Sequence, residues 1–155
     1  MAPRIINGSS ELKTLVGEHI GYSEWTEITQ GQVNLFAEAT GDHQWIHVDP
    51  ERAIKESPFG GPIAHGYLTL SLGPVLLPQV AITTGFKMGV NYGCNKVRFP
   101  APVPVGSRIR AGVELMSVTS ASLGSQIATK VTIELQGSDK PACVAETLAV
   151  MVGKD

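Results

Sequence analysis

Hydrophobic and polar residues follow two different periods along this chain. Apolar residues three and four positions apart indicate helices in the first half, and apolar residues at every second position indicate strands in the second half. The predicted helices cover about residues 9–16, 30–40, 50–56 and 65–77. The predicted strands cover about residues 22–28, 90–99, 107–118, 126–136 and 142–152. The chain therefore combines helices with a run of consecutive strands.

Two of the predicted helices have clear boundary residues. Thr29 is a typical N-cap, and Gly41 is a typical C-terminal stop for the helix between them. Asp49 is the expected N-cap of the next helix, with Pro50 at its first position. These local signals predict a helix–loop–helix arrangement in which residues 42–48 form the loop.

The predicted helix at 65–77 is apolar on nearly all sides, which is typical of a buried helix. Long consecutive strands favour an antiparallel sheet, and one face of that sheet must be covered. The pattern predicts an α+β fold in which a curved antiparallel sheet wraps around a central apolar helix. Linkers and repeats are lacking, so residues 1–155 are expected to form a single domain.

The composition narrows the possible partners. Charged residues make up 17% of the chain, against about 25% in an ordinary soluble domain. This low fraction indicates that a partner hides some apolar surface, and a homo-oligomer is the simplest such partner. A net charge of −2 gives no basic excess, which argues against nucleic acid. No apolar run reaches the roughly 18 residues of a membrane span, so no membrane association is expected.

Cysteine and histidine usage points to a cytoplasmic protein without a metal. The N-terminus lacks the apolar core of a secretory signal. Cys94 and Cys143 form no CxxC pair and are expected to remain reduced within strands. The histidines lack the spacing of a zinc site, and the pair at positions 43 and 47 does not match the HExxH pattern. We therefore expect no metal and no cofactor.

Two segments carry candidate chemistry. Asp42 and His47 lie five residues apart, directly after Gly41. A carboxylate and an imidazole at this spacing can converge on one water molecule, as the addition of water to a polarised double bond requires. Gly66 lies at the start of the apolar helix, where an unpaired N–H can stabilise an oxygen that gains negative charge.

Each of these residues also has a simpler explanation. Asp42 alone is typical of a turn, and His47 alone of a hydrogen-bonded core histidine. The two segments together favour catalysis. His65 has two possible roles: it contacts the substrate, or it braces the helix start through a hydrogen bond to a loop carbonyl.

The order of these segments resembles a known family. The segments are Thr40-Gly41-Asp42, His47, Gly61-Pro62-Ile63-Ala64-His65-Gly66, Tyr92-Gly93 and Val97-Arg98-Phe99. They resemble the MaoC-type dehydratases, which include the (R)-specific enoyl-CoA hydratases with the hotdog fold. The similarity covers about residues 28–118 by motif and is closest to the nodulation-factor-N-like branch, which has a mycobacterial hydratase. It implies a homodimer joined edge to edge, with each active site near the interface.

The family motif reads roughly Asp-x-Asn-Pro-x-His, and this chain departs from it at two positions. Gln44 replaces the Asn and keeps an amide that can form the same hydrogen bonds. Trp45 replaces the Pro, and we expect it to narrow the acyl tunnel. Arg98 is either strand surface or a contact to a coenzyme A phosphate. The resemblance thus places Gln44, Trp45, His65 and Arg98 among the substrate-binding residues.

The expected activity is the reversible addition of water to a trans-2-enoyl-CoA, with Asp42, His47 and Gly66 as the catalytic residues. A hotdog acyl-CoA thioesterase is the first alternative, because the same carboxylate can direct water at the thioester carbonyl. A non-catalytic acyl-thioester-binding subunit is the second. Free thiol release separates the hydratase from the thioesterase.

Overall fold

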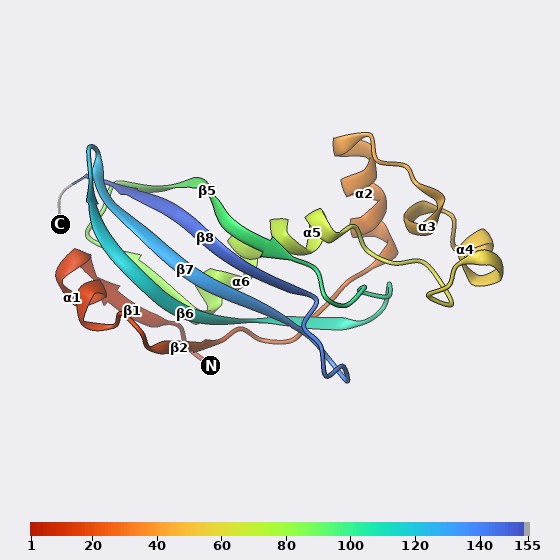
Figure 1. Cartoon of the computed structure of the whole chain (residues 1–155), viewed down its shortest axis with the longest axis horizontal. Helices are drawn as coiled ribbons and strands as arrows, with labels where there is room; N and C mark the ends of the chain where they lie inside the picture. Colours follow the sequence, from red (N-terminus) through yellow and green to blue (C-terminus); the bar gives the residue numbers. More distant parts are fainter. Residues whose placement is uncertain (154–155) are drawn as a thin grey trace.

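An antiparallel sheet forms the body of the protein (Figure 1). The structure is a computed structural model that describes residues 1–153. The sheet has the strand order β2-β6-β7-β8-β5, and β3 also pairs with β6. Its strands are β2 (His19–Tyr22), β3 (Thr26–Glu27), β5 (Met88–Arg98), β6 (Arg108–Ala121), β7 (Gly124–Leu135) and β8 (Cys143–Val152). The predicted antiparallel sheet is confirmed.

Six helices accompany the sheet within residues 1–153. They are α1 (Gly8–Thr14), α2 (Gln30–Thr40), α3 (Trp45–Val48), α4 (Pro50–Glu56), α5 (Gly66–Ser71) and α6 (Gly73–Val80). Figure 1 shows α5 and α6 running along the inner face of the sheet, with α2, α3 and α4 beyond one end and α1 at the other. The α+β arrangement of a sheet around central helices is therefore confirmed.

The alternation of buried residues in the sheet and the caps of α2 and α4 agree with the predictions from the sequence. On β6, Ile109 and Ala111 are fully buried, as predicted from their spacing. The Thr29 side chain accepts a hydrogen bond from the Gln32 N–H, and Gly41 ends α2 in the left-handed conformation at φ 79°. The Asp49 carboxylate accepts from the N–H of Arg52 at 3.1 Å, which caps α4.

The prediction of one continuous buried helix at 65–77 is wrong. The helix is interrupted at Leu72, and α6 starts at Gly73 with Pro74 in its first turn. Pro74 has no N–H to donate to the preceding turn, so it fits the start of a helix better than its interior. Nor is the pair of helices buried on all sides, because Tyr67 is 70% exposed and Val75 54% exposed.

The predicted strand at 22–28 is divided into β2 and β3. Between them, the Ser23 Oγ accepts a hydrogen bond from the Ala111 N–H at 2.9 Å, so a side chain replaces part of the strand pairing. The sequence also gave no indication of α3 or of a parallel pair formed by β1 (Arg4–Asn7) and β4 (Ala81–Thr84). Two strands of four residues each, far apart in sequence, carry little periodicity.

Two separate hydrophobic cores fill the fold. The larger core lies between α2, α5, α6 and the sheet and includes Ile28, Val33 and Leu76. The smaller core packs α1 and β1 against the sheet through Ile6, Leu12, Leu15, Leu115 and Ile127. None of the helices in residues 1–153 is long and apolar enough to cross a membrane.

Both cysteines are free thiols within strands, as predicted. Cys94 is exposed on β5, and Cys143 is buried at the start of β8. Burial raises the pKa of the Cys143 thiol to about 11. The Cys143 thiol is therefore unreactive at neutral pH.

Candidate active site

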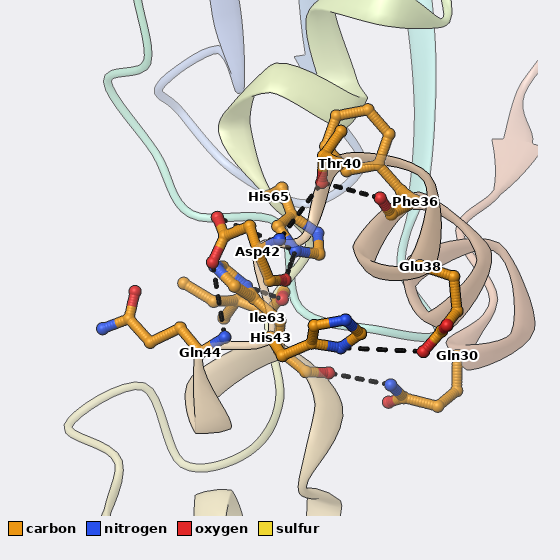
Figure 2. Close-up of polar contacts among 10 residues, drawn as sticks. Gln30, Phe36, Glu38, Thr40, Asp42, His43, Gln44, Ile63 and His65 are labelled. Carbon is orange, nitrogen blue, oxygen red and sulfur yellow. Dashed lines mark hydrogen bonds and ion pairs between the residues drawn. The ribbon is translucent and has the colours of Figure 1, made fainter.

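The candidate residues meet where the loop after α2 approaches the start of α5. Asp42 follows Gly41, the C-cap of α2, and His47 lies in the short helix α3. His65 precedes α5, and Gly66 is the first residue of that helix. Figure 2 shows Asp42, Ile63 and His65 close together, while the Gln44 side chain points away from them.

The His47 imidazole is held through one nitrogen, and the other has no hydrogen-bond partner among the described residues. Its Nδ1 lies 2.6 Å from the Ile63 carbonyl oxygen, which can only accept, so Nδ1 carries the hydrogen and donates it. The other nitrogen, Nε2, then has a lone pair. The Gln30 amide also donates to the His47 main-chain oxygen at 2.8 Å, which fixes the backbone of α3. His47 is therefore oriented as a proton acceptor.

Burial lowers the pKa of His47 below its usual value of 6.5. Desolvation of the charged ring is the largest cause, and the neighbouring His65 lowers the pKa further. The hydrogen bond to Ile63 and the charge of Asp42 act in the opposite direction without reversing the shift. At neutral pH the imidazole is therefore unprotonated and able to accept a proton.

The lowered pKa makes stability depend on pH. As the pH falls below 6.5, the unfolded chain takes up this proton before the native protein does. The native state is therefore expected to lose free energy of unfolding between 6.5 and the lower pKa of the folded imidazole. Urea unfolding of the wild type and of His47→Gln across this range measures the effect. The two proteins should differ in slope, and equal slopes would contradict the lowered pKa.

Asp42 is more exposed than His47. Its side chain is 51% accessible, and one carboxylate oxygen accepts from the Gln44 N–H at 3.3 Å. The other lies 3.9 Å from the His65 Nε2. One carboxylate oxygen of Asp42 and one ring nitrogen each of His47 and His65 all lie within 4.8 Å of one another. A single water molecule can span such a separation between Asp42 and His47, since each hydrogen bond is about 2.8 Å long.

An apolar cavity of about 400 Å³ lies beside His47. Its walls include Ile63, Gly66 and Phe99. A side chain at position 66 would approach the Phe99 ring to 3.1 Å, so the glycine leaves this space open. The first-turn N–H groups of a helix have no intrahelical partner. The Gly66 N–H therefore lies beside a cavity that can take an apolar chain.

Asp42, His47 and His65 do not form a suitable metal site, although their ligand atoms lie close together. The rings of His47 and His65 are stacked, with centroids 3.9 Å apart and planes 25° apart. A metal binds imidazole in the plane of the ring, and stacked rings do not direct two lone pairs at one point. This geometry supports the expectation that no metal is bound.

The other predicted site residues are distributed around this centre. The Gln44 main chain bonds to Asp42, and its side chain is exposed. The Trp45 ring lies under the Arg52 guanidinium at 4.3 Å and is not among the residues that line the cavity. Arg98 is exposed at the end of β5, donating to the Val97 carbonyl at 2.7 Å, directly before Phe99. His65 is 2% exposed and is likewise not a lining residue.

Comparison with known proteins identifies the family. The sequence model described as a MaoC like domain matches residues 11–136, which is most of the chain. The chain belongs to the MaoC-like dehydratase family. The family and the enzyme class predicted from the sequence are thus confirmed.

Individual relatives agree with the family model. The 3-hydroxyacyl-thioester dehydratase Z of Mycobacterium tuberculosis is 55% identical over 94% of this chain and 96% of that protein. Nodulation protein N of Rhizobium meliloti is 46% identical over 91% of this chain and 89% of that protein. The solved R-hydratase PhaJ1 from Pseudomonas aeruginosa has a TM-score of 0.71 at 22% identity, covering 90% of this chain and 83% of that chain. This last likeness confirms the hotdog fold of the MaoC-like chain.

Several contributors to this MaoC-like site were not identified from the sequence. The Ile63 carbonyl orients His47, but any residue carries a carbonyl, so no side-chain pattern reveals it. Phe36 packs against His65 with ring centroids 5.0 Å apart, and it was assigned only to the apolar face of α2. Phe99 lies in the Val97-Arg98-Phe99 segment that contributed to the resemblance, and its place in the cavity wall depends on tertiary structure.

Proposed function

We propose that this MaoC-like protein reversibly adds water to a trans-2-enoyl-CoA and gives the (R)-3-hydroxyacyl-CoA. The main support is that the Asp42 carboxylate and a ring nitrogen of His47 lie within 4.8 Å of each other, and that His47 lines an apolar cavity. The relative at 55% identity is named as a dehydratase of 3-hydroxyacyl thioesters, which is the reverse direction of the same reaction. The R-hydratase among the fold neighbours motivates the stereochemistry.

In the proposed reaction, Asp42 and His47 hold the attacking water between them. The water oxygen bonds to C3, and one water proton passes to this pair. The C2–C3 π electrons move toward the thioester oxygen, where the Gly66 N–H stabilises the enolate charge. The carbonyl then re-forms as the pair returns a proton to C2. The sum is one water added across the double bond, and neither residue is changed.

The substrate-binding roles of the surrounding residues are part of the same proposal. The cavity beside Gly66 takes the thioester end of the acyl chain, and the exposed Arg98, which directly precedes the cavity-lining Phe99, contacts a coenzyme A phosphate. Gln44 holds the Asp42 carboxylate through its main-chain N–H. Trp45 is stacked on Arg52 and lies outside the cavity lining, so its expected effect on the acyl tunnel stays a prediction. We expect the enzyme to act in the cytoplasm without a metal or cofactor.

Loss of the conjugated enoyl thioester on mixing with the purified protein tests this function. Crotonyl-CoA is the first substrate, and a free-thiol assay is run on the same samples. A hydratase consumes the conjugated bond and releases no thiol. Thiol release in proportion to substrate would indicate the thioesterase instead. Saturable binding without either product would indicate a non-catalytic subunit.

We further propose that two copies of the chain associate through β5. This strand is at the edge of the sheet, with β8 as its one neighbour among the described residues. It exposes Met88, Val90 and Tyr92, which are 57%, 47% and 68% accessible in the single chain. An exposed apolar edge strand favours pairing with another strand. Such a dimer would bring a second copy close to Phe99, which follows β5 directly.

Substitution of Val90 by lysine is expected to shift the protein from dimer toward monomer. The lysine introduces a charge into the proposed interface and leaves the larger core untouched. Sedimentation velocity at fixed concentration measures the mass. The matched control is Leu35→Lys, on α2, where the side chain is 73% exposed. A wild type with the mass of a single chain, or a Val90→Lys dimer as stable as the control, would contradict the interface.

A further inference from the structure

We propose that His65 is a positioning residue that fixes Asp42 and His47 relative to each other. The inference rests on the proposed function, since it gives His65 a role in that same reaction. His65 is 2% exposed and lies between the loop that carries Asp42 and the start of α5. Figure 2 shows its ring directed toward Asp42. Two different contacts of this one ring, one to each member of the catalytic pair, support the role.

The first contact holds the main chain of Asp42. The His65 Nε2 lies 2.9 Å from the Asp42 carbonyl oxygen, across 23 residues of sequence. A carbonyl oxygen only accepts, so Nε2 carries the hydrogen. Asp42 follows the end of α2, where its other hydrogen bonds within residues 1–153 are the 3.4 Å bond from its N–H to Thr40 and the bond from the Gln44 N–H. The bond from His65 therefore fixes the main chain from which the Asp42 carboxylate extends.

The second contact holds the ring of His47. The two imidazoles are stacked at 3.9 Å, while Phe36 packs against His65 at 5.0 Å. The hydrogen bond to Ile63 fixes one edge of the His47 ring but leaves rotation about that bond possible. Stacking on His65 restricts this rotation. Together the contacts hold a ring nitrogen of His47 and a carboxylate oxygen of Asp42 within 4.8 Å of each other.

A third observation separates this role from simple packing. The Nδ1 of His65 is buried, and within residues 1–153 no hydrogen-bond partner reaches it. An unpaired buried polar atom lowers stability. A phenylalanine would fill the same space and keep the stacking without this penalty. Compared with phenylalanine, the imidazole therefore lowers stability but supplies an N–H to Asp42. Such a trade-off is typical of functional sites.

Two substitutions divide the contacts of His65. His65→Phe keeps an aromatic ring against His47 and removes the N–H, while His65→Gln keeps an N–H near the position of Nε2 and removes the ring. With crotonyl-CoA, His65→Phe is expected to lower kcat by up to about 100-fold, because misplacement by about 1 Å has this effect. Its KM should change little and its Tm should not fall. His65→Gln should recover part of kcat with a lower Tm.

The matched control is His43→Phe, which changes an exposed histidine on the same loop, 50% accessible and 3.7 Å from Glu38. It should keep wild-type kcat. Wild-type kcat in His65→Phe would overturn the proposal, and so would a loss of kcat that His65→Gln does not partly restore. If His65→Phe fails to fold, the expectation that phenylalanine carries no stability penalty at this position is wrong, and the proposal is overturned.

Nitrogen-15 NMR of labelled histidines tests the same inference without turnover. The wild type should show the hydrogen of His65 on Nε2, and a hydrogen on Nδ1 would overturn the proposal. A wild type with these signals but no turnover of any enoyl thioester would refute the proposed reaction and leave the positioning contacts intact.

Discussion

Replacement of His47 by glutamine is expected to lower kcat for enoyl-CoA hydration by about 10²- to 10⁴-fold, the usual contribution of a general acid–base residue. Glutamine keeps a polar side chain in the buried site but cannot accept a proton from water. KM should change much less than kcat, because His47 acts on the water rather than on the acyl chain. Steady-state kinetics with crotonyl-CoA measures both values.

The equivalent change at Asp42, to asparagine, should have an effect of the same order. The two residues hold one water. The kcat of the double variant is therefore expected to be only slightly lower than the kcat of the less active single variant. His43→Gln is the control, because the His43 side chain lies 3.7 Å from Glu38 and outside the cluster. A single variant that keeps more than about a tenth of the wild-type kcat would exclude its residue from the chemistry.

Replacement of Leu76 by alanine is expected to lower the free energy of unfolding by about 2–5 kcal/mol. Leu76 lies on α6, is 0% exposed and belongs to the larger core. Removing its side chain leaves a cavity between α6 and the sheet that the fixed sheet cannot close. Urea unfolding at one protein concentration measures the change, with the slope of the transition expected to stay the same.

Leu35→Ala is the control for this substitution, since the side chain is 73% exposed on α2. It makes the same chemical change in a helix and should alter stability by no more than about 0.5 kcal/mol. If Leu76→Ala loses less than about 1 kcal/mol, the central helix is not the packing centre of the fold. If both variants lose equal amounts, helix propensity rather than burial explains the result.

Features set by neighbouring residues could be predicted from the sequence. The caps at Thr29 and Gly41 act within one helical turn, so the limits of α2 followed directly. The same holds for Asp49 and Pro50 at α4. The sheet strands were evident because one buried face imposes strict alternation, as on β6. In each case the physical cause lies within the segment itself.

Features set by distant residues could not be predicted in this way. The pairing of β1 with β4 joins segments more than seventy residues apart, and each strand is too short to show a period. The break between α5 and α6 was missed because apolar periodicity continues across it. Pro74 does indicate a helix start at this point, because proline fits the first turn of a helix better than its interior. The exposure of Tyr67 and Val75 depends on what covers the helix in space, which periodicity does not reveal.

The candidate site shows the same division. The spacing of Asp42 and His47 was sufficient to suggest a shared water, because short loops keep such residues close. The role of His65 was left open between substrate contact and bracing, and the hydrogen bond to the Asp42 carbonyl is of the kind that bracing predicts. The carbonyl of Ile63 and the ring of Phe36 act through tertiary placement alone.

The presence of two hydrophobic cores gives the two ends of this protein different evolutionary freedom. The core under α1 and β1 shares no buried residue with the larger core that supports the loop and helix starts around His47. Mutations that remodel the N-terminal end can therefore accumulate while the reacting groups keep their arrangement. A lineage built on this scaffold can diversify at one end and conserve its chemistry at the other.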